Sequence, residues 1–253
     1  MPVTKEERED ALASACMQVK RVLPEFTTKF QNAYSENGFY RPIDNVEWTT
    51  GFWTGEIWLA YEYGGEDVLL KAAEIQMQDF LHRIEQKICV DHHDMGFLYT
   101  PSCVAGYKLT GSGTGKRAAL LAADQLKSRF QEKGEFIQAW GTMGEPENYR
   151  LIIDCLLNVP LLYWASQETG DESYRQIADR HVHTTLENVI RPDFSTWHTF
   201  FFDPVTGQPV RATGTVLPGR EARRGEFTER HSHTAIQKER NTNIFSVVSV
   251  NII

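Results

Sequence analysis

A weak internal repeat is the sequence feature that most constrains how this chain can fold. In each unit a glycine is followed eight positions later by an alanine, at Gly65 and Ala73, Gly115 and Ala123, and Gly170 and Ala178. Each of these segments opens with polar residues and continues as an amphipathic pattern, which predicts a half-exposed helix.

An apolar stretch precedes each glycine: TGFWTGEIWLAYEY, PSCVAGYKLT and LIIDCLLNVPLLYWASQET. The first and third carry few charges, as expected of helices packed on all sides. The predicted unit is a buried helix, a short turn containing glycine, and a half-exposed helix. A period of about 50 to 55 residues favours an array of helix pairs over a four-helix bundle. Arrays of this kind run open as solenoids or close as toroids, and the aromatic inner helices favour a toroid.

One β-like insertion interrupts the helical pattern. The segment WHTFFFDPVTGQPVRA has alternating aromatic residues followed by a Pro-Val-Thr-Gly turn, which predicts a β-hairpin. The fold class expected is therefore all-α, a toroid of helix pairs with one β-hairpin.

Charge and composition narrow the function. The 253-residue chain has a formal net charge of −8, which argues against nucleic acid because phosphate binding requires clustered Lys and Arg. A sugar or another small molecule fits better. No apolar run approaches the roughly 20 residues of a membrane span, and MPVTKEERED lacks the apolar core of a signal peptide, so we expect a cytoplasmic protein without a membrane partner. The cysteines have no CxxC spacing, which predicts buried free thiols at Cys16, Cys89, Cys103 and Cys155.

Tryptophans concentrate near the segment starts, where a toroid opens into its cleft: Trp48, Trp53, Trp140 and Trp197. Sugar rings stack on such side chains, although core packing is the alternative for any single tryptophan. The clustering favours sugar binding for Trp48 and Trp140.

Two aspartates are candidate catalytic residues. Asp154 lies in the apolar segment LIIDCLLNVPLL, where desolvation should raise its pKa and suit it to donate a proton. A buried, hydrogen-bonded structural aspartate is an equally good interpretation. Asp94 ends the polar run of DHHDMGFLY just before Gly96, and we expect it on a loop at the entrance of an inner helix.

Three other patterns predict structure rather than chemistry. Asp91, His92, His93 and Asp94 are all potential metal ligands, but consecutive side chains diverge, so no metal site is expected. His181 and His183 point to different faces of a predicted helix and should be exposed to solvent. Residues 111–116 are similar to a phosphate loop but follow no strand, and they predict a helix–helix turn.

Four segments carry a resemblance to a known family: NVEWTTGFWTGEIWLAYEY, HHDMGFLYTPSC, IIDCLLNVPLLYWA and STWHTFFFDPVTGQPVRA. They resemble the unsaturated glucuronyl hydrolases, the family-88 glycoside hydrolases, in the family's order and at about its spacing. The resemblance covers roughly residues 10 to 213 and implies a toroid of the (α/α)6 type, here incomplete with about three to four helix pairs. It implies that Asp154 is the general acid/base and Asp94 the second essential carboxylate. It also implies that His93, Trp48, Trp140 and His198 line the subsite for the unsaturated uronate.

The implied substrate is an unsaturated glycosaminoglycan oligosaccharide of the chondroitin or hyaluronan disaccharide type. By this resemblance, Asp154 protonates C4 of the C4=C5 vinyl ether and its carboxylate then helps water to add at C5. The hemiketal collapses, the ring opens and the partner sugar leaves, with no metal or organic cofactor. The alternatives are an unsaturated rhamnogalacturonyl hydrolase, which shares this chemistry, and an inactive remnant that binds sugar through Trp48 and Trp140.

The match to the family ends after Arg211. We expect residues 1–213 to be the N-terminal part of the glycosidase domain, and residues 214–253 to be an aberrant tail produced by a frame change or a truncated gene model. The tail has no G-x7-A unit, whereas six helix pairs need roughly 300 to 330 residues. The expected consequence is a poorly soluble and at most weakly active polypeptide.

Overall fold

A computed structural model describes residues 3–191 and 195–214, which are mainly helical with three small sheets. The expected boundary after residue 213 cannot be followed, because all of the tail except Gly214 lies outside the described residues. The α-helices are α1 (Lys5–Phe26), α2 (Thr50–Gly64), α3 (Asp67–Glu85), α4 (Met95–Tyr99), α5 (Ala105–Thr110), α6 (Gly113–Lys127), α7 (Pro160–Thr169) and α8 (Glu172–Asn188). A π-helical turn, η1 (Thr100–Val104), joins α4 to α5, and a 3-10 helix, η2 (Ile153–Leu157), precedes α7.

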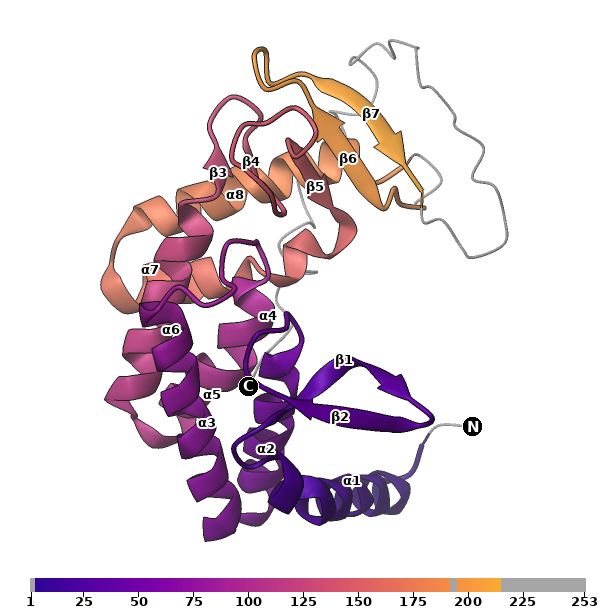
Figure 1. Cartoon of the computed structure of the whole chain (residues 1–253), viewed down its shortest axis with the longest axis vertical. Helices are drawn as coiled ribbons and strands as arrows, with labels where there is room; N and C mark the ends of the chain where they lie inside the picture. Colours follow the sequence, from indigo (N-terminus) through magenta and orange to yellow (C-terminus); the bar gives the residue numbers. More distant parts are fainter. Residues whose placement is uncertain (1–2, 192–194, 215–253) are drawn as a thin grey trace. The chain divides into compact units, whose positions relative to one another are not determined.

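The predicted helix pairs are present in the described part of the chain. Helix α2 packs on α3, α5 on α6, and α7 on α8. Successive pairs also contact one another, so that α2, α4 and α7 form one row while α3, α6 and α8 form another (Figure 1). The candidate site lies at the start of α4, which belongs to the first of these rows.

The repeat is real, but its second unit is shifted by four residues from the one predicted. Gly65, Gly111 and Gly170 end the first helix of each pair with φ between 66° and 76°, a backbone conformation that glycine adopts without strain. The turn glycine of the second unit is therefore Gly111. Its alanine is Ala119, and the equivalent alanines of all three units are fully buried: Ala73, Ala119 and Ala178.

The stretch 111–116 is consequently only in part a helix–helix turn. Ser112 is the N-cap of α6 and its hydroxyl accepts a hydrogen bond from the Gly115 amide. Residues from Gly113 onward already belong to the helix, so the predicted turn is too long.

The apolar segment before Gly170 is not one continuous helix, as the pattern suggested. Arg150–Ile152 forms strand β5, η2 follows, and α7 begins only at Pro160. Proline fits the first turn of a helix, where its missing N–H is not needed. Asp154 therefore lies on a short 3-10 turn between a strand and a helix.

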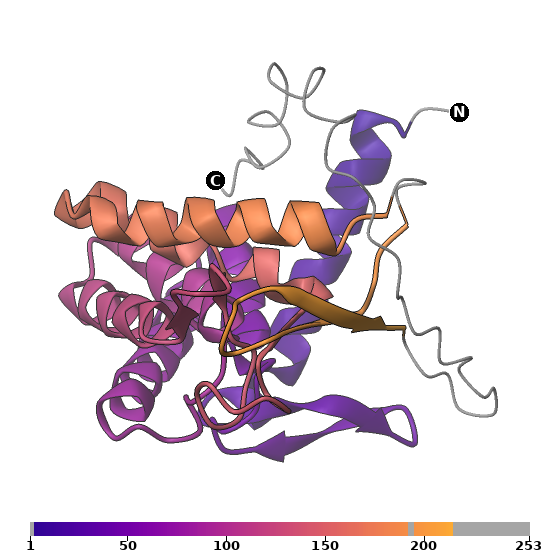
Figure 2. The ribbon, with the colours of Figure 1, turned by 90° about the horizontal axis from the view of Figure 1, so that it is seen from above.

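The predicted hairpin is confirmed as β6 (Thr199–Phe202) and β7 (Pro209–Thr213), which pair antiparallel and add to β5 (Figure 1). Figure 2 shows the hairpin from above, in orange and gold. The other two hairpins were not predicted. They are formed by β1 (Phe30–Glu36) with β2 (Phe39–Ile43), and by β3 (Phe130–Gln131) with β4 (Phe136–Ile137).

Two hydrophobic clusters form the core of the described residues, a large one between the helices and a small one beneath β5 and β6. Cys103 and Cys155 are buried free thiols as expected, and burial raises the pKa of each to about 12. Cys89 is exposed and Cys16 half-buried, so the prediction is wrong for Cys89.

His181 is a further correction. It is 1% exposed rather than open to solvent, because β4 covers that face of α8 and the Ile137 amide donates to its Nδ1. Burial lowers the pKa of His181 to about 3, which keeps it neutral. His183, two residues on, is exposed as predicted and faces Glu187.

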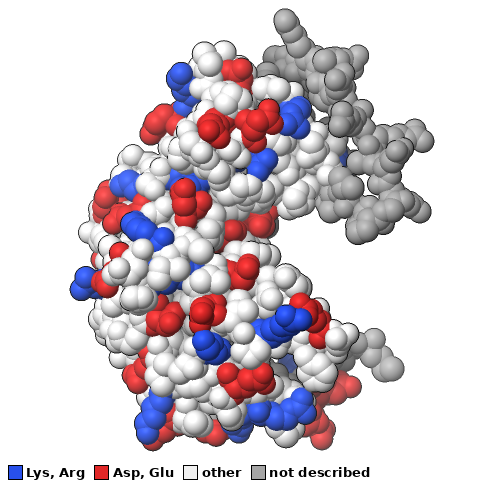
Figure 3. All heavy atoms as spheres, viewed as in Figure 1, with Lys and Arg blue, Asp and Glu red and all other residues white. Residues whose placement is uncertain are grey.

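Acidic and basic side chains are interspersed over the face seen in Figure 3, with no large patch of one sign. Among the described residues, no helix combines the length and apolar character needed to cross a membrane.

Candidate active site

Three ionisable side chains from two elements meet at the entrance of the first row of helices. His93 and Asp94 immediately precede α4, and Asp154 comes from η2. His93 Nε2 lies 3.2 Å from Asp94 Oδ1 and 3.6 Å from Asp154 Oδ1. The imidazole is 1% exposed and stands between the two carboxyl groups, so the two predicted catalytic aspartates share one site.

A close backbone contact brings these two elements together. An ideal Cβ on Gly96 would lie 2.2 Å from Asn158 Cα, so only glycine lets α4 approach this closely. The Phe97 amide also donates to Asn158 Oδ1 over 3.0 Å. Gly96 follows Asp94 by two residues and Asn158 follows Asp154 by four, so this contact fixes the separation of the carboxylates.

Asp94 is held as a carboxylate. Burial acts to raise its pKa, but interactions with His92 and His93 outweigh burial and place the pKa below its usual range. His92 Nδ1 lies 2.9 Å from Asp94 Oδ2, and His92 Nε2 lies 2.9 Å from the Cys89 carbonyl oxygen. Asp94 is therefore fixed from two sides and ionised near neutral pH.

The pKa of Asp154 is shifted in the opposite direction, above its usual value. Desolvation by burial raises its pKa, an electrostatic interaction with His93 lowers it, and the negative charge of Asp94 raises it further. The raised pKa expected from the sequence is confirmed. Two neighbouring carboxyl groups whose pKa values are pushed apart are suited to different roles, one as a proton donor and one as a fixed negative charge.

Trp140 and His198 reach the site through backbone pairing. The His93 amide donates to the Ala139 carbonyl oxygen over 2.7 Å, which places the next residue, Trp140, edge-on to the His93 ring at 6.5 Å between centroids. On the other side, the Ile153 amide donates to the His198 carbonyl oxygen over 2.9 Å. His198 thus lies beside Ile153, the residue that precedes Asp154.

The four tryptophans near the segment starts do not share one environment: two are well exposed, as sugar stacking requires, and one is packed in the core. Trp48 and Trp140 are 42% and 41% exposed, and Trp48 packs edge-on against Phe97 of α4 at 5.6 Å between centroids. Trp53 is a core residue that donates to the Phe26 carbonyl oxygen. Trp197 lies under the Arg191 guanidinium at 3.7 Å.

Two arginines near the site were missed by the sequence reasoning. Arg150 on β5, Phe201 on β6 and Arg211 on β7 are paired across the three strands. Both guanidinium groups lie over the Phe201 ring, and that of Arg150 also lies 4.6 Å from the centre of Trp140. The predicted hairpin contained Phe201 and Arg211, but only the pairing of β6 with β5 shows that Arg150 lies beside them.

The run of four potential metal ligands diverges only in part. Asp91 turns away to Arg129, as expected for consecutive side chains, but His92 and His93 both lie against Asp94, so the expected divergence is wrong for these three. A different set, His93, Asp94 and Asp154, offers one ligand atom each within 4.8 Å of one another. Such an arrangement is also that of an acid/base site, and the absence of a metal remains a prediction.

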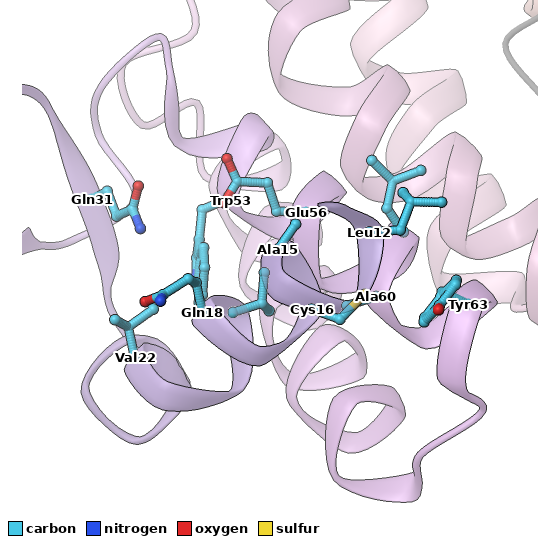
Figure 4. Close-up of a pocket in the computed structure, with 12 residues that line it drawn as sticks. Leu12, Ala15, Cys16, Gln18, Val22, Gln31, Trp53, Glu56, Ala60 and Tyr63 are labelled. Carbon is cyan, nitrogen blue, oxygen red and sulfur yellow. The ribbon is translucent and has the colours of Figure 1, made fainter. Parts of the chain in front are cut away.

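A cavity lies apart from the carboxylate site. It has a volume of about 510 Å³ and is lined by mostly apolar side chains of α1, β1 and α2, among them Leu12, Trp53 and Tyr63 (Figure 4). None of the residues that line it belongs to the carboxylate site.

Comparison with known proteins identifies a family. The family model for Glycosyl Hydrolase Family 88 matches residues 18–215. The unsaturated chondroitin disaccharide hydrolase of Streptococcus pneumoniae is 51% identical over 209 residues, which cover 83% of this chain and 53% of that protein. The unsaturated glucuronyl hydrolase of Bacillus sp. is 40% identical over 204 residues, covering 80% of this chain and 54% of that protein.

The likeness extends to solved structures. The crystal structure of the unsaturated glucuronyl hydrolase of Streptococcus agalactiae matches with a TM-score of 0.83 at 48% identity, covering 84% of this chain and 54% of that chain. This chain spans about half the length of the curated relatives it matches.

Proposed function

Because the chain belongs to glycosyl hydrolase family 88, we propose that its site removes the 4,5-unsaturated glucuronyl residue from glycosaminoglycan disaccharides of the chondroitin type. We propose further that residues 1–213 are part of an (α/α)6 toroid, to which the three helix pairs contribute. The observation that carries the function is the pair Asp94 and Asp154, which meet at His93 with pKa values shifted in opposite directions.

The spacing of the two aspartates supports their roles. Two solved structures of the Streptococcus agalactiae enzyme each carry one aspartate-to-asparagine substitution, at positions 60 residues apart, and one of these is complexed with dGlcA-GalNAc6S. Asp94 and Asp154 are separated by the same 60 residues. We therefore propose that Asp94 and Asp154 correspond to the two aspartates that were substituted in that enzyme.

The reaction begins with Asp154. Its raised pKa leaves a proton that it can give to C4 of the vinyl ether, so that positive charge develops at C5 and the ring oxygen. Water adds at C5 and returns a proton to the Asp154 carboxylate. The resulting hemiketal opens the ring, and the partner sugar leaves. One residue therefore acts first as acid and then as base.

The surrounding residues fix the substrate. The ionised Asp94 accepts hydrogen bonds from sugar hydroxyls, while Trp48 and Trp140 present ring faces for stacking. His93 and His198 complete the uronate subsite beside Asp154. Arg150 lies over Trp140 and Arg211 over Phe201, and their positive charge favours an anionic sugar in a chain of net charge −8.

Turnover of two disaccharides tests this function. We expect the protein to remove the ultraviolet absorbance of an unsaturated chondroitin disaccharide, because hydration destroys the conjugated double bond. An unsaturated rhamnogalacturonan disaccharide should be consumed at least about tenfold more slowly, since each misplaced polar group leaves a partner unpaired. The reverse preference would assign the rhamnogalacturonyl activity, and binding of the disaccharide without turnover would identify a non-catalytic sugar-binding remnant.

A further inference from the structure

Two buried arginines, Arg83 and Arg129, stand at the same position of successive repeat units. Each follows the turn glycine of its unit by 18 residues, Arg83 after Gly65 and Arg129 after Gly111. Both side chains are 1% exposed. Arg83 lies in the last turn of α3 and Arg129 just beyond the end of α6, where a cation is favoured by the helix dipole.

Arg83 joins the segment before α2 to the segment before α4. It donates, over 2.8 to 3.3 Å, to the backbone oxygens of Val46, Glu47, Ile88 and Cys89 and to the side chains of Asn45 and Thr50. The first segment carries Trp48, and the second leads into residues 88–94, which we call the acid loop because they end in His93 and Asp94. One guanidinium thus fixes a tryptophan relative to the acid loop.

Arg129 makes the corresponding connection on the other side. It forms an ion pair with Asp91 of the acid loop and donates to the backbone oxygens of Gln138 and Gly141 over 2.9 and 3.2 Å. Gln138 and Gly141 flank Trp140, so this arginine fixes the second exposed tryptophan relative to the same loop. In the third unit the equivalent residue is Asn188, whose side chain bonds only to Thr184 of its own helix among the described residues.

We propose that Arg83 and Arg129 are paired positioning residues of the active site, which hold the acid loop between the two tryptophans. This inference rests on the proposed function for the identity of the substrate. The planar fork of arginine donates in several fixed directions at once, which the single ammonium of lysine cannot reproduce. Neither arginine contacts Asp154, so both act through the acid loop and the two tryptophans that place the substrate.

The substitutions Arg83→Lys and Arg129→Lys test the proposal with the charge retained. We expect KM for the unsaturated chondroitin disaccharide to rise at least about tenfold while kcat stays within about threefold, because misplaced stacking surfaces weaken binding in the ground and transition states alike. Arg180→Lys is the matched control, since Arg180 is partly exposed and bridges Glu132 and Glu135, and its KM should not change.

Hydrogen exchange provides a readout that does not depend on turnover. The His93 amide bonds to Ala139, across the two segments that Arg129 joins. In Arg129→Lys this amide should exchange faster, while amides in the middle of α3 and α6 keep their rates. Should the lysine variant not accumulate, Asp91→Asn weakens the same contact from its exposed side and should accelerate the same amide to a smaller degree.

The outcomes separate the two claims. A fall in apparent kcat at unchanged KM would show that the arginines only maintain the amount of folded protein, and would overturn the proposal. Unchanged KM and unchanged His93 exchange would overturn it as well. If the unsubstituted protein consumes no unsaturated disaccharide, the proposed function fails, and exchange of the His93 amide alone then decides whether Arg129 positions the acid loop.

Discussion

Replacing Asp154 with asparagine should lower the rate of disaccharide hydration by about 10²- to 10⁴-fold, the usual contribution of a general acid/base. The amide keeps the shape of the side chain but cannot donate a proton to C4 or accept one from water. Loss of the substrate's ultraviolet absorbance measures the rate. Asp179→Asn, on an exposed aspartate that accepts a hydrogen bond from Tyr163, is the control and should retain full activity.

Stability distinguishes this chemical effect from unfolding. Burial raises the pKa of Asp154, so its ionised form is less stable in the folded protein than in the unfolded chain. Removing that charge should leave the melting temperature at neutral pH unchanged or higher. A variant that retained more than about a tenth of the activity would remove Asp154 from the acid/base role.

The pH dependence follows from the same shift. The acid form of Asp154 starts the reaction, so kcat/KM should fall as pH rises through its raised pKa. Asp94 remains ionised down to low pH because its own pKa is lowered, and it does not produce this decline. In Asp154→Asn the residual kcat/KM should no longer fall with rising pH, which would show that the fall is caused by titration of Asp154.

Gly96→Ala should destabilise the fold by about 3 kcal/mol or more, at the upper end of what inserted atoms cost in a packed interior. The added Cβ would lie 2.2 Å from Asn158 Cα and 2.6 Å from the Asn158 carbonyl oxygen. Backbone cannot rotate away as a flexible side chain can, so α4 and the segment after η2 must separate. Urea denaturation of the variant and the parent protein measures the loss.

Gly113→Ala is the matched control for that substitution. Gly113 begins α6, and no atom lies within 4 Å of an added Cβ. Alanine is the better helix former, so this variant should change stability by no more than about 1 kcal/mol, in the stabilising direction. Equal effects of the two substitutions would mean that the Gly96–Asn158 contact does not hold the carboxylates together.

The sequence predicted the surroundings of the two aspartates better than the elements that carry them. Asp94 was placed at the start of an inner helix and Asp154 in apolar surroundings, because polar clusters before apolar runs and lone acids within them are local signals. The strand and 3-10 turn around Asp154 were missed, since a short apolar run fits a buried strand and a buried helix equally well. Pro160 was the available sign of where α7 begins.

The register of the repeat and the burial of His181, Arg83 and Arg129 could not be predicted without the tertiary structure. Residues 111–115 contain three glycines, and only the positive φ of Gly111 identifies the one in the turn. His181 was assigned to solvent because its burial depends on β4, which is distant in sequence. Arg83 and Arg129 look like solvated charges on outer helices, and the acceptors that permit their burial are mostly backbone oxygens, which no residue type reveals.

The central claim is that this site hydrates a double bond rather than cleaving the glycosidic bond directly. The most direct test follows the vinylic C4 proton of the unsaturated chondroitin disaccharide by NMR while the protein acts in D2O. We predict that this signal disappears no later than the partner sugar is released, and that the earliest product carries deuterium at C4. Release of the partner sugar while the C4 proton signal persists would contradict the account.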